Sequence, residues 1–156
     1  MKSKPKSCLP GAGVLLAVCL AAGALERVSI RSLASGAFSG ITEARQEVIK
    51  SQVSWDKFLA AHQANTRSGP KLPAVDFSKE MVIAVTMGRK NSGGYAIEIT
   101  GVETTRDALK VFVKRTSPAP GAITIAALTA PFHCVAAPKS DLRVEFVDTP
   151  APEKAR

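Results

Sequence analysis

The adjacent residues His133 and Cys134 are the first candidates for chemistry, because a histidine can activate a cysteine as a thiolate nucleophile. They lie in residues 129–136, which we predict to be a strand opened by a proline. Neighbouring residues of a strand point to opposite faces, so these two side chains cannot form the hydrogen bond that activation needs. We therefore expect Cys134 to be a small buried residue, on the same face as Phe132 and Ala136, with His133 on the other face.

His62 is the residue to consider for metal binding, but no cysteine, histidine or carboxylate lies near it at the spacing of a metal site. We expect a histidine at the margin of the core. After residue 24 the sequence lacks the HExxH, CxxC, GxSxG and GxxxxGK[ST] patterns of zinc hydrolases, redox proteins, serine hydrolases and nucleotide-binding proteins. We therefore expect a protein that is not an enzyme and that uses no metal and no cofactor.

The best candidate for a binding site is a basic, glycine-containing segment, in which positive charge, flexible residues and an aromatic ring come together. It consists of Arg89, Lys90, Asn91, Ser92, Gly93, Gly94 and Tyr95. One interpretation is a hairpin turn whose glycines take positive φ and whose tyrosine packs beneath it. The other is a recognition loop that reaches into a protein partner. The two interpretations are compatible.

One amphipathic helix is expected near residues 54–65. Ser54 is a suitable N-cap, because its hydroxyl can accept from the free amides of the first turn. The apolar stripe of this helix recurs at the i, i+3, i+4, i+7 spacing of a buried face and comprises Trp55, Phe58, Leu59 and His62. We expect this face to pack on a sheet.

Short strands account for most of the remaining pattern. They are predicted at residues 27–33, 46–50, 81–87, 95–99, 109–114, 129–136 and 142–147. The apolar run 81–87 is typical of a strand covered on both faces, and with 95–99 it indicates a hairpin. The expected fold class is α+β: a mostly antiparallel sheet of about six to seven short strands with one packed helix.

The N-terminal segment is typical of export. Residues 1–7 carry three lysines, and residues 8–25 are uncharged and mostly apolar. The small residues Ala22, Gly23 and Ala24 suit a signal peptidase that cuts after Ala24. We therefore divide the chain into a signal peptide or membrane anchor (1–24), a folded domain (25–148) and a disordered tail (149–156), and we expect an exported protein of the periplasm or cell envelope.

Two alternatives to cleavage remain open. A retained membrane helix needs about 20 apolar residues, and this run is just short of that. A lipoprotein would be acylated at Cys19, although Val18 is larger than the residue expected before such a cysteine. Cleavage after Ala24 would remove Cys8 and Cys19 and leave Cys134 alone, which excludes an internal disulfide.

The chain is basic, with a formal net charge of +8 from 21 basic and 13 acidic residues. Lys2, Lys4 and Lys6 account for part of this excess, so the remainder is only mildly basic. The basic residues form no stripe with interleaved aromatic residues, so we expect no nucleic-acid binding. Weak attraction to anionic lipid or cell-wall polymer fits this charge, which gives a structural envelope protein as one alternative.

Several phrases of the sequence resemble the PrcB C-terminal domain family. They are residues 40–49 with Ser54 and Trp55, residues 88–99, and residues 129–133 with 137–140. The resemblance spans residues 28–146, and its most specific part is Gly93-Gly94-Tyr95. It implies a noncatalytic, exported accessory protein that helps a surface protease complex to assemble or mature. Gly93-Gly94-Tyr95 is also similar to the loops of small β-sandwich protease inhibitors, which gives protease inhibition as a second alternative.

Overall fold

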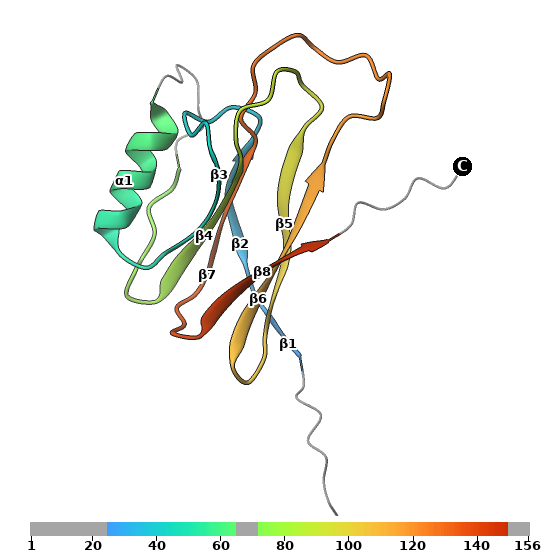
Figure 1. Ribbon diagram of the computed structural model, residues 1–156. Coiled ribbons are helices and arrows are strands. Elements are labelled where there is room, and N and C mark those ends of the chain that lie inside the picture. The colour runs from blue at the N-terminus through green and yellow to red at the C-terminus, as the bar shows by residue number, and fades with distance from the viewer. Residues whose placement is uncertain (1–24, 65–71, 150–156) are drawn as a thin grey trace, which may run out of the picture.

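The computed structural model describes residues 25–64 and 72–149, which contain eight strands and one helix (Figure 1). The elements are β1 (Glu26–Val28), β2 (Arg31–Gly36), β3 (Ala44–Ile49), α1 (Gln52–Gln63), β4 (Glu80–Met87), β5 (Ala96–Thr104), β6 (Ala108–Thr116), β7 (Phe132–Pro138) and β8 (Arg143–Thr149). The predicted signal segment 1–24 lies outside the described residues, as do residues 150–156 of the predicted tail. Thr149 is not part of a tail, because it pairs with Lys114 and ends β8.

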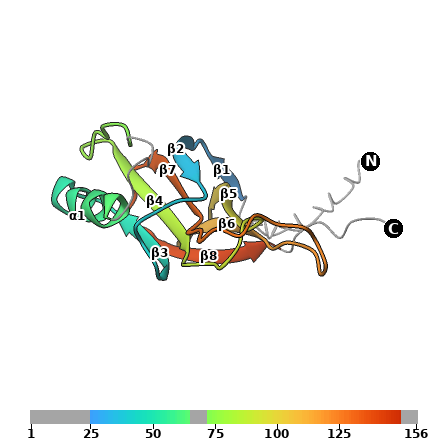
Figure 2. The same ribbon diagram turned by 90° about the horizontal axis from the view of Figure 1, so that it is seen from above.

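The strands form two four-stranded sheets that pack face to face (Figures 1 and 2). We name the sheet β2-β7-β4-β3 the covered sheet, because α1 lies on its other face, and the sheet β1-β5-β6-β8 the open sheet. All neighbouring strands are antiparallel except β6 and β8, which are parallel. The predicted α+β class, mostly antiparallel with one packed helix, is confirmed, but the eight strands form two sheets, whereas one sheet of about six to seven strands was predicted.

Two hydrophobic cores follow from this three-layer arrangement. The core between the two sheets contains Met81, Ile83, Val85, Met87, Ile97, Ile99, Val102, Leu109, Val111, Val113, Val135 and Ala137. The core between α1 and the covered sheet contains Ile41, Ile49, Trp55, Phe58, Val82, Ala84, Phe132 and Cys134. Strand β4 supplies both cores from alternate residues, because successive side chains of a strand point to opposite faces. The prediction that residues 81–87 are covered on both faces is confirmed.

Helix α1 begins earlier than predicted. Its N-cap is Ser51, not Ser54: the Ser51 backbone is extended, and its hydroxyl accepts from the Ser54 N–H at 3.3 Å. Ser51 can play the same capping role and comes first, so the Trp55 N–H already donates to the Ser51 carbonyl at 3.0 Å. The early start also lets the Gln52 amide donate to Asp56 one turn later, at 2.8 Å.

His62 is fully buried, so the expectation of a histidine at the margin of the core is wrong. Its ring stacks on Phe58 and meets the edge of Phe132 with the ring centroids 4.4 Å apart. Its Nδ1 is 3.0 Å from the Ser39 hydroxyl. The apolar stripe therefore continues to the end of the helix, because a neutral imidazole with a hydroxyl partner can replace an apolar side chain there.

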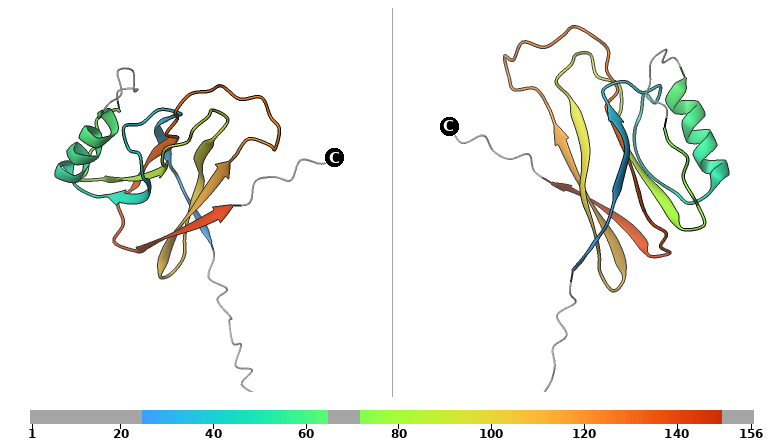
Figure 3. Two further views of the ribbon diagram at one scale, coloured as in Figure 1. Left: turned by 45° about the horizontal axis from the view of Figure 1, so that its top comes forward. Right: turned by 180° about the vertical axis from the view of Figure 1, so that it is seen from behind.

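The predicted hairpin between residues 81–87 and 95–99 does not exist. Strand β4 already pairs with β3 and β7 on its two sides, while β5 pairs with β6 and β1 in the other sheet. The predicted strand 27–33 is likewise two strands, because the chain leaves the open sheet after Val28 and joins the covered sheet at Arg31 (Figure 3). Both errors have the same cause: local alternation does not show when a chain changes sheets.

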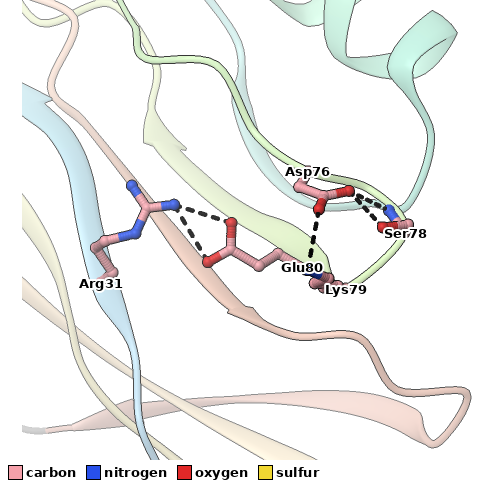
Figure 4. A network of polar contacts seen from close by, with 5 residues as sticks. All are labelled: Arg31, Asp76, Ser78, Lys79 and Glu80. Atoms are coloured by element: carbon pink, nitrogen blue, oxygen red, sulfur yellow. Dashed lines mark hydrogen bonds and ion pairs between the residues drawn. The ribbon is translucent and has the colours of Figure 1, made fainter.

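An ion pair fixes β2 across the intervening strand β7. The Arg31 guanidinium, on β2, donates to both carboxylate oxygens of Glu80, on β4, at 2.9 and 3.2 Å (Figure 4). The turn before β4 is closed by Asp76, whose carboxylate accepts from the Ser78 N–H at 3.0 Å.

No helix in the described ranges is long and apolar enough to cross a membrane.

Candidate functional site

The predicted binding segment, residues 89–95, connects β4 of the covered sheet to β5 of the open sheet. Its backbone is held at both sides: the Arg89 N–H donates to the Thr42 carbonyl at 2.9 Å, and Lys90 exchanges two backbone hydrogen bonds with Thr129, at 2.7 and 2.9 Å. Gly94 has a φ of 86°, which agrees with the predicted positive φ, whereas Gly93 does not have the positive φ predicted for it. The segment is therefore an anchored connection between sheets and not a free tip.

A second loop, residues 117–131 between β6 and β7, pairs with this connection. The Gly93 N–H donates to the Ile125 carbonyl at 3.0 Å, and the Thr129 hydroxyl donates to the Ser92 carbonyl at 2.8 Å. A Cβ at Gly93 would lie 2.6 Å from Ile125 Cγ1, so a side chain at this position would force the Ile125 side chain to move. Gly93 thus lies at the contact between the two loops.

The other predicted site residues differ in exposure. Arg89, Asn91 and Gly94 are exposed, whereas Ser92 is half-buried. The Lys90 ammonium lies 5.4 Å from the centroid of the Tyr95 ring, and Tyr95 packs against the core between the sheets. The predicted packing of Tyr95 is confirmed, and the segment presents two cations on a rigid backbone.

The loop 117–131 is the feature that the sequence analysis missed. It exposes three aliphatic side chains, Ile123 by 103%, Ile125 by 65% and Leu128 by 61%, and Phe38 on a neighbouring loop is exposed by 53%. These loops lie with the connection 89–95 at one end of the sandwich, at the top of Figure 1. We call residues 37–43, 88–95 and 117–131 the loop end.

A sequence signal for this surface was present. No charged residue occurs between Arg115 and Lys139, although the proline and glycine residues of the first part predict an exposed loop. Exposed loops without charge but with several isoleucine or leucine residues are unusual. Each apolar side chain left in water loses the stabilising free energy of about 1.5–3 kcal/mol that its burial would contribute. A hollow of about 210 Å³ at the loop end is lined by Phe38, Leu128 and Arg89 among others, so apolar and cationic groups share one surface.

Residues 81–138 match the family model described as PrcB C-terminal. This part of the chain is therefore similar to the PrcB C-terminal family. The match runs from the second residue of β4 to the end of β7, and it includes both the connection 89–95 and the loop 117–131. The resemblance inferred from the sequence is therefore confirmed over less than half of the chain. No curated protein and no solved structure matches the sequence.

Within residues 81–138, the side chains of His133 and Cys134 point to opposite faces of the covered sheet, as predicted. Cys134 belongs to the core against α1, and burial raises the pKa of its thiol to about 12. His133 lies on the face toward the open sheet, and its pairing partner on the neighbouring strand β2 is Ser35. A thiol that remains protonated and has no base beside it cannot serve as a nucleophile.

His133 links the covered sheet to the open sheet. Its Nδ1 accepts from the backbone N–H of Ile99 on β5 at 2.8 Å, and its Nε2 lies 3.0 Å from the Ser32 hydroxyl on β2. Because Nδ1 is the acceptor, the proton of the neutral ring lies on Nε2 and is donated to Ser32. Burial lowers the pKa of His133, with a smaller opposing effect of Glu98. Within residues 25–64 and 72–149, no cluster of three or more potential ligands could hold a metal ion.

Proposed function

We propose that this protein is an exported, noncatalytic accessory protein that binds a protein partner through its loop end, and that the partner is an extracytoplasmic protease complex. The family match supports the association with a protease complex, because the PrcB C-terminal family is named for such an accessory subunit. The N-terminal sequence, with lysines followed by an uncharged apolar stretch, supports export.

The single observation that carries the binding role is the exposure of Ile123, Ile125, Leu128 and Phe38 on loops that are tied to the sandwich. An exposed apolar group flanked by polar residues is typical of a protein-binding surface. Rigid loops lose little conformational entropy when they bind, so more of the contact energy becomes affinity. Arg89 and Lys90 add positive charge at the edge of this surface and would favour an acidic rim on the partner.

The noncatalytic character is supported by the state of His133 and Cys134, the pair that the sequence suggested as a base and its nucleophile. Cys134 is buried with a raised pKa, and the His133 nitrogens are engaged with Ile99 and Ser32. We propose the structural role for both residues. We expect that replacing either residue in a protein that still folds abolishes no enzymatic activity. An enzymatic activity that Cys134→Ala abolishes would contradict this.

The loop end is tested by recovery of a partner from an envelope extract of the source organism. The variant Ile123→Asp with Ile125→Asp places charge on the exposed aliphatic positions, and Val53→Asp is the matched control, because Val53 is 66% exposed on α1. We expect the unmodified protein and Val53→Asp to recover a protease complex and the loop variant to lose it at least tenfold. Equal recovery by a folded loop variant would disprove the role of the loop end.

Two further measurements separate the alternatives. A protease panel slowed by the purified protein at low concentration would favour inhibition, although the connection 89–95 is not the hairpin on which that alternative was based. Association with envelope material that falls steeply with salt would favour a structural protein held by charge, because exposed charges are screened over about 10 Å at 0.1 M salt. Mass spectrometry of the mature N-terminus tests export: Leu25 as first residue supports cleavage, Met1 an anchor, and acylated Cys19 a lipoprotein.

A further inference from the structure

One strand position in the open sheet is only half occupied. Strand β1 pairs with β5 over three residues, Val102, Glu103 and Thr104, and then the chain crosses to the covered sheet as β2. Over residues 96–101, β5 has β6 on one side and no paired strand among the described residues on the other. At the usual rise of a strand, this vacant stretch is roughly 17 Å long. We call it the vacant edge.

The backbone of β5 presents hydrogen-bonding groups along the vacant edge. The Ile99 N–H points to this side, because it donates to His133 Nδ1 at 2.8 Å. In an antiparallel strand the N–H and C=O of one residue point the same way, and alternate residues repeat this direction. The N–H and C=O of Ile97 therefore also point to the vacant edge, where no described strand pairs with them.

A groove lies beside the vacant edge and gives a strand room to enter. Its volume is about 540 Å³, and it runs between β5 and β2, with Ile30, Phe132 and His133 among its lining residues. Strand β2 is itself the outermost strand of the covered sheet. Its residues Ser32 and Ser35 line the groove opposite Ile97 of β5. Tyr95 lines the groove where it adjoins the loop end.

Specific interactions limit strand pairing at the end of the vacant edge that lies next to β1. A register shift between Ile99 and Gly101 marks a β-bulge where the pairing with β1 stops. His133 satisfies the Ile99 N–H there and is held by Ser32. Bulges and side-chain partners at an edge limit how far an added strand can pair. A strand added to this edge would therefore end at His133 and pair with the residues of β5 that precede Ile99.

We propose that the vacant edge of β5 binds an extended peptide segment of a partner protein by strand addition, with main-chain hydrogen bonds to Ile97 and alternate apolar side chains directed into the groove. Main-chain pairing gives affinity in such complexes, and pockets for alternate side chains give specificity. Apolar side chains fit the part of the groove that Ile30, Tyr95 and Ile97 line, because these residues pack on the side of the core between the sheets. This site is separate from the exposed aliphatic groups of the loop end and does not depend on the function proposed above.

The first test uses a phage library of linear seven-residue peptides, panned against the intact chain. The variant Ser35→Trp fills the groove, because Ser35 is exposed in β2 and faces the open sheet beside His133. Gln46→Trp is the matched control, since Gln46 is exposed in the other edge strand of the same sheet and pairs with the inward-facing Val85. We expect enriched peptides with apolar residues at alternate positions, binding the unmodified protein and Gln46→Trp equally and Ser35→Trp at least tenfold more weakly.

The second test asks whether the main chain of the peptide makes the contact. The best enriched peptide is synthesised with N-methyl groups on one set of alternate residues or on the other set. We expect one set to weaken binding at least tenfold and the other to leave it unchanged, and we expect slower hydrogen exchange at the Ile97 amide in the complex. The proposal would be overturned if both sets of N-methyl groups weakened binding equally. It would also be overturned if the enriched peptides bound Ser35→Trp as tightly as the unmodified protein, or if panning enriched no peptides for the unmodified protein over Ser35→Trp. Self-association that Ser35→Trp abolishes would assign the edge to a second copy of this chain instead.

Discussion

The covered sheet and the open sheet have the same number of strands but different surroundings. In β4 and β7 nearly every residue is buried, because the open sheet lies on one face and α1 on the other. In β5 and β6 burial alternates, because only one face of the open sheet is covered. The covered sheet is therefore the scaffold. The open sheet has an exposed face and the vacant edge, and the loops at one end join the two sheets.

The largest expected effect is the loss of the layer that distinguishes the covered sheet. Trp55 is 2% exposed, stacks on Phe58 with ring centroids 5.6 Å apart, and fills the core between α1 and β4. We expect Trp55→Ala to lower the free energy of unfolding by about 3–5 kcal/mol, measured by urea denaturation. A loss below 1 kcal/mol would mean that α1 contributes little to the scaffold.

A somewhat smaller effect is expected where the chain approaches the end of α1. A Cβ at Gly40 would lie 2.0 Å from the Ala64 carbonyl oxygen and 2.5 Å from that of Ala61. We expect Gly40→Ala to destabilise by about 1–3 kcal/mol, because backbone atoms must move to admit a methyl group. The control is Gly101→Ala in β5, where a Cβ would meet nothing within 4 Å. Equal unfolding midpoints for the two variants would contradict this account.

Acid should weaken the scaffold in a graded way. Burial lowers the pKa of both His62, on the α1 side, and His133, on the open-sheet side. In both cases the folded pKa is below the unfolded value of about 6.5, so the stability is complete above that pH and is lost as the pH falls through the folded pKa. Thermal unfolding measured between pH 8 and pH 4 should show this decline.

The variant His133→Gln separates the two contributions. A glutamine amide can accept from the Ile99 N–H and donate to Ser32, as His133 does, but it does not gain a proton. We expect the unfolding temperature of this variant to fall less steeply with acid than that of the unmodified protein. An identical pH dependence would assign the whole effect to His62.

The difference between the sheets also explains which structural predictions succeeded. The alternation of Leu109, Val111 and Val113 and the apolar run 81–87 predicted the strands and their burial, because the period of side chains along a strand is fixed by its geometry. The pairing of strands depends on contacts between distant residues. Residues 28–31 continue one extended pattern while the chain passes from one sheet to the other, so the sequence predicted a single strand there.

The candidate site was predictable in part for the same reason. Gly93 and Gly94 indicated a special backbone conformation, but the sequence did not show that Gly93 makes room for Ile125, because that contact joins two loops. The vacant edge had no sequence signal, since it results from the point where β1 stops pairing with β5. The exposed Ile123 and Ile125 could have been noticed, because they lie in an uncharged stretch after a Pro/Gly loop.

The smallest expected effect on stability is at the loop end, where the comparison with the covered sheet is most direct. Ile123 is 103% exposed, whereas Ile83 in β4 is 0% exposed. Isoleucine-to-alanine substitution therefore removes the same atoms from water at position 123 and from the core at position 83. We expect Ile83→Ala to cost about 2–5 kcal/mol and Ile123→Ala to change the unfolding free energy by less than about 0.5 kcal/mol. A loss above 1 kcal/mol for Ile123→Ala would show that its side chain packs within the protein. If the difference is as expected, folding does not account for an isoleucine at position 123, which agrees with the partner binding proposed for the loop end.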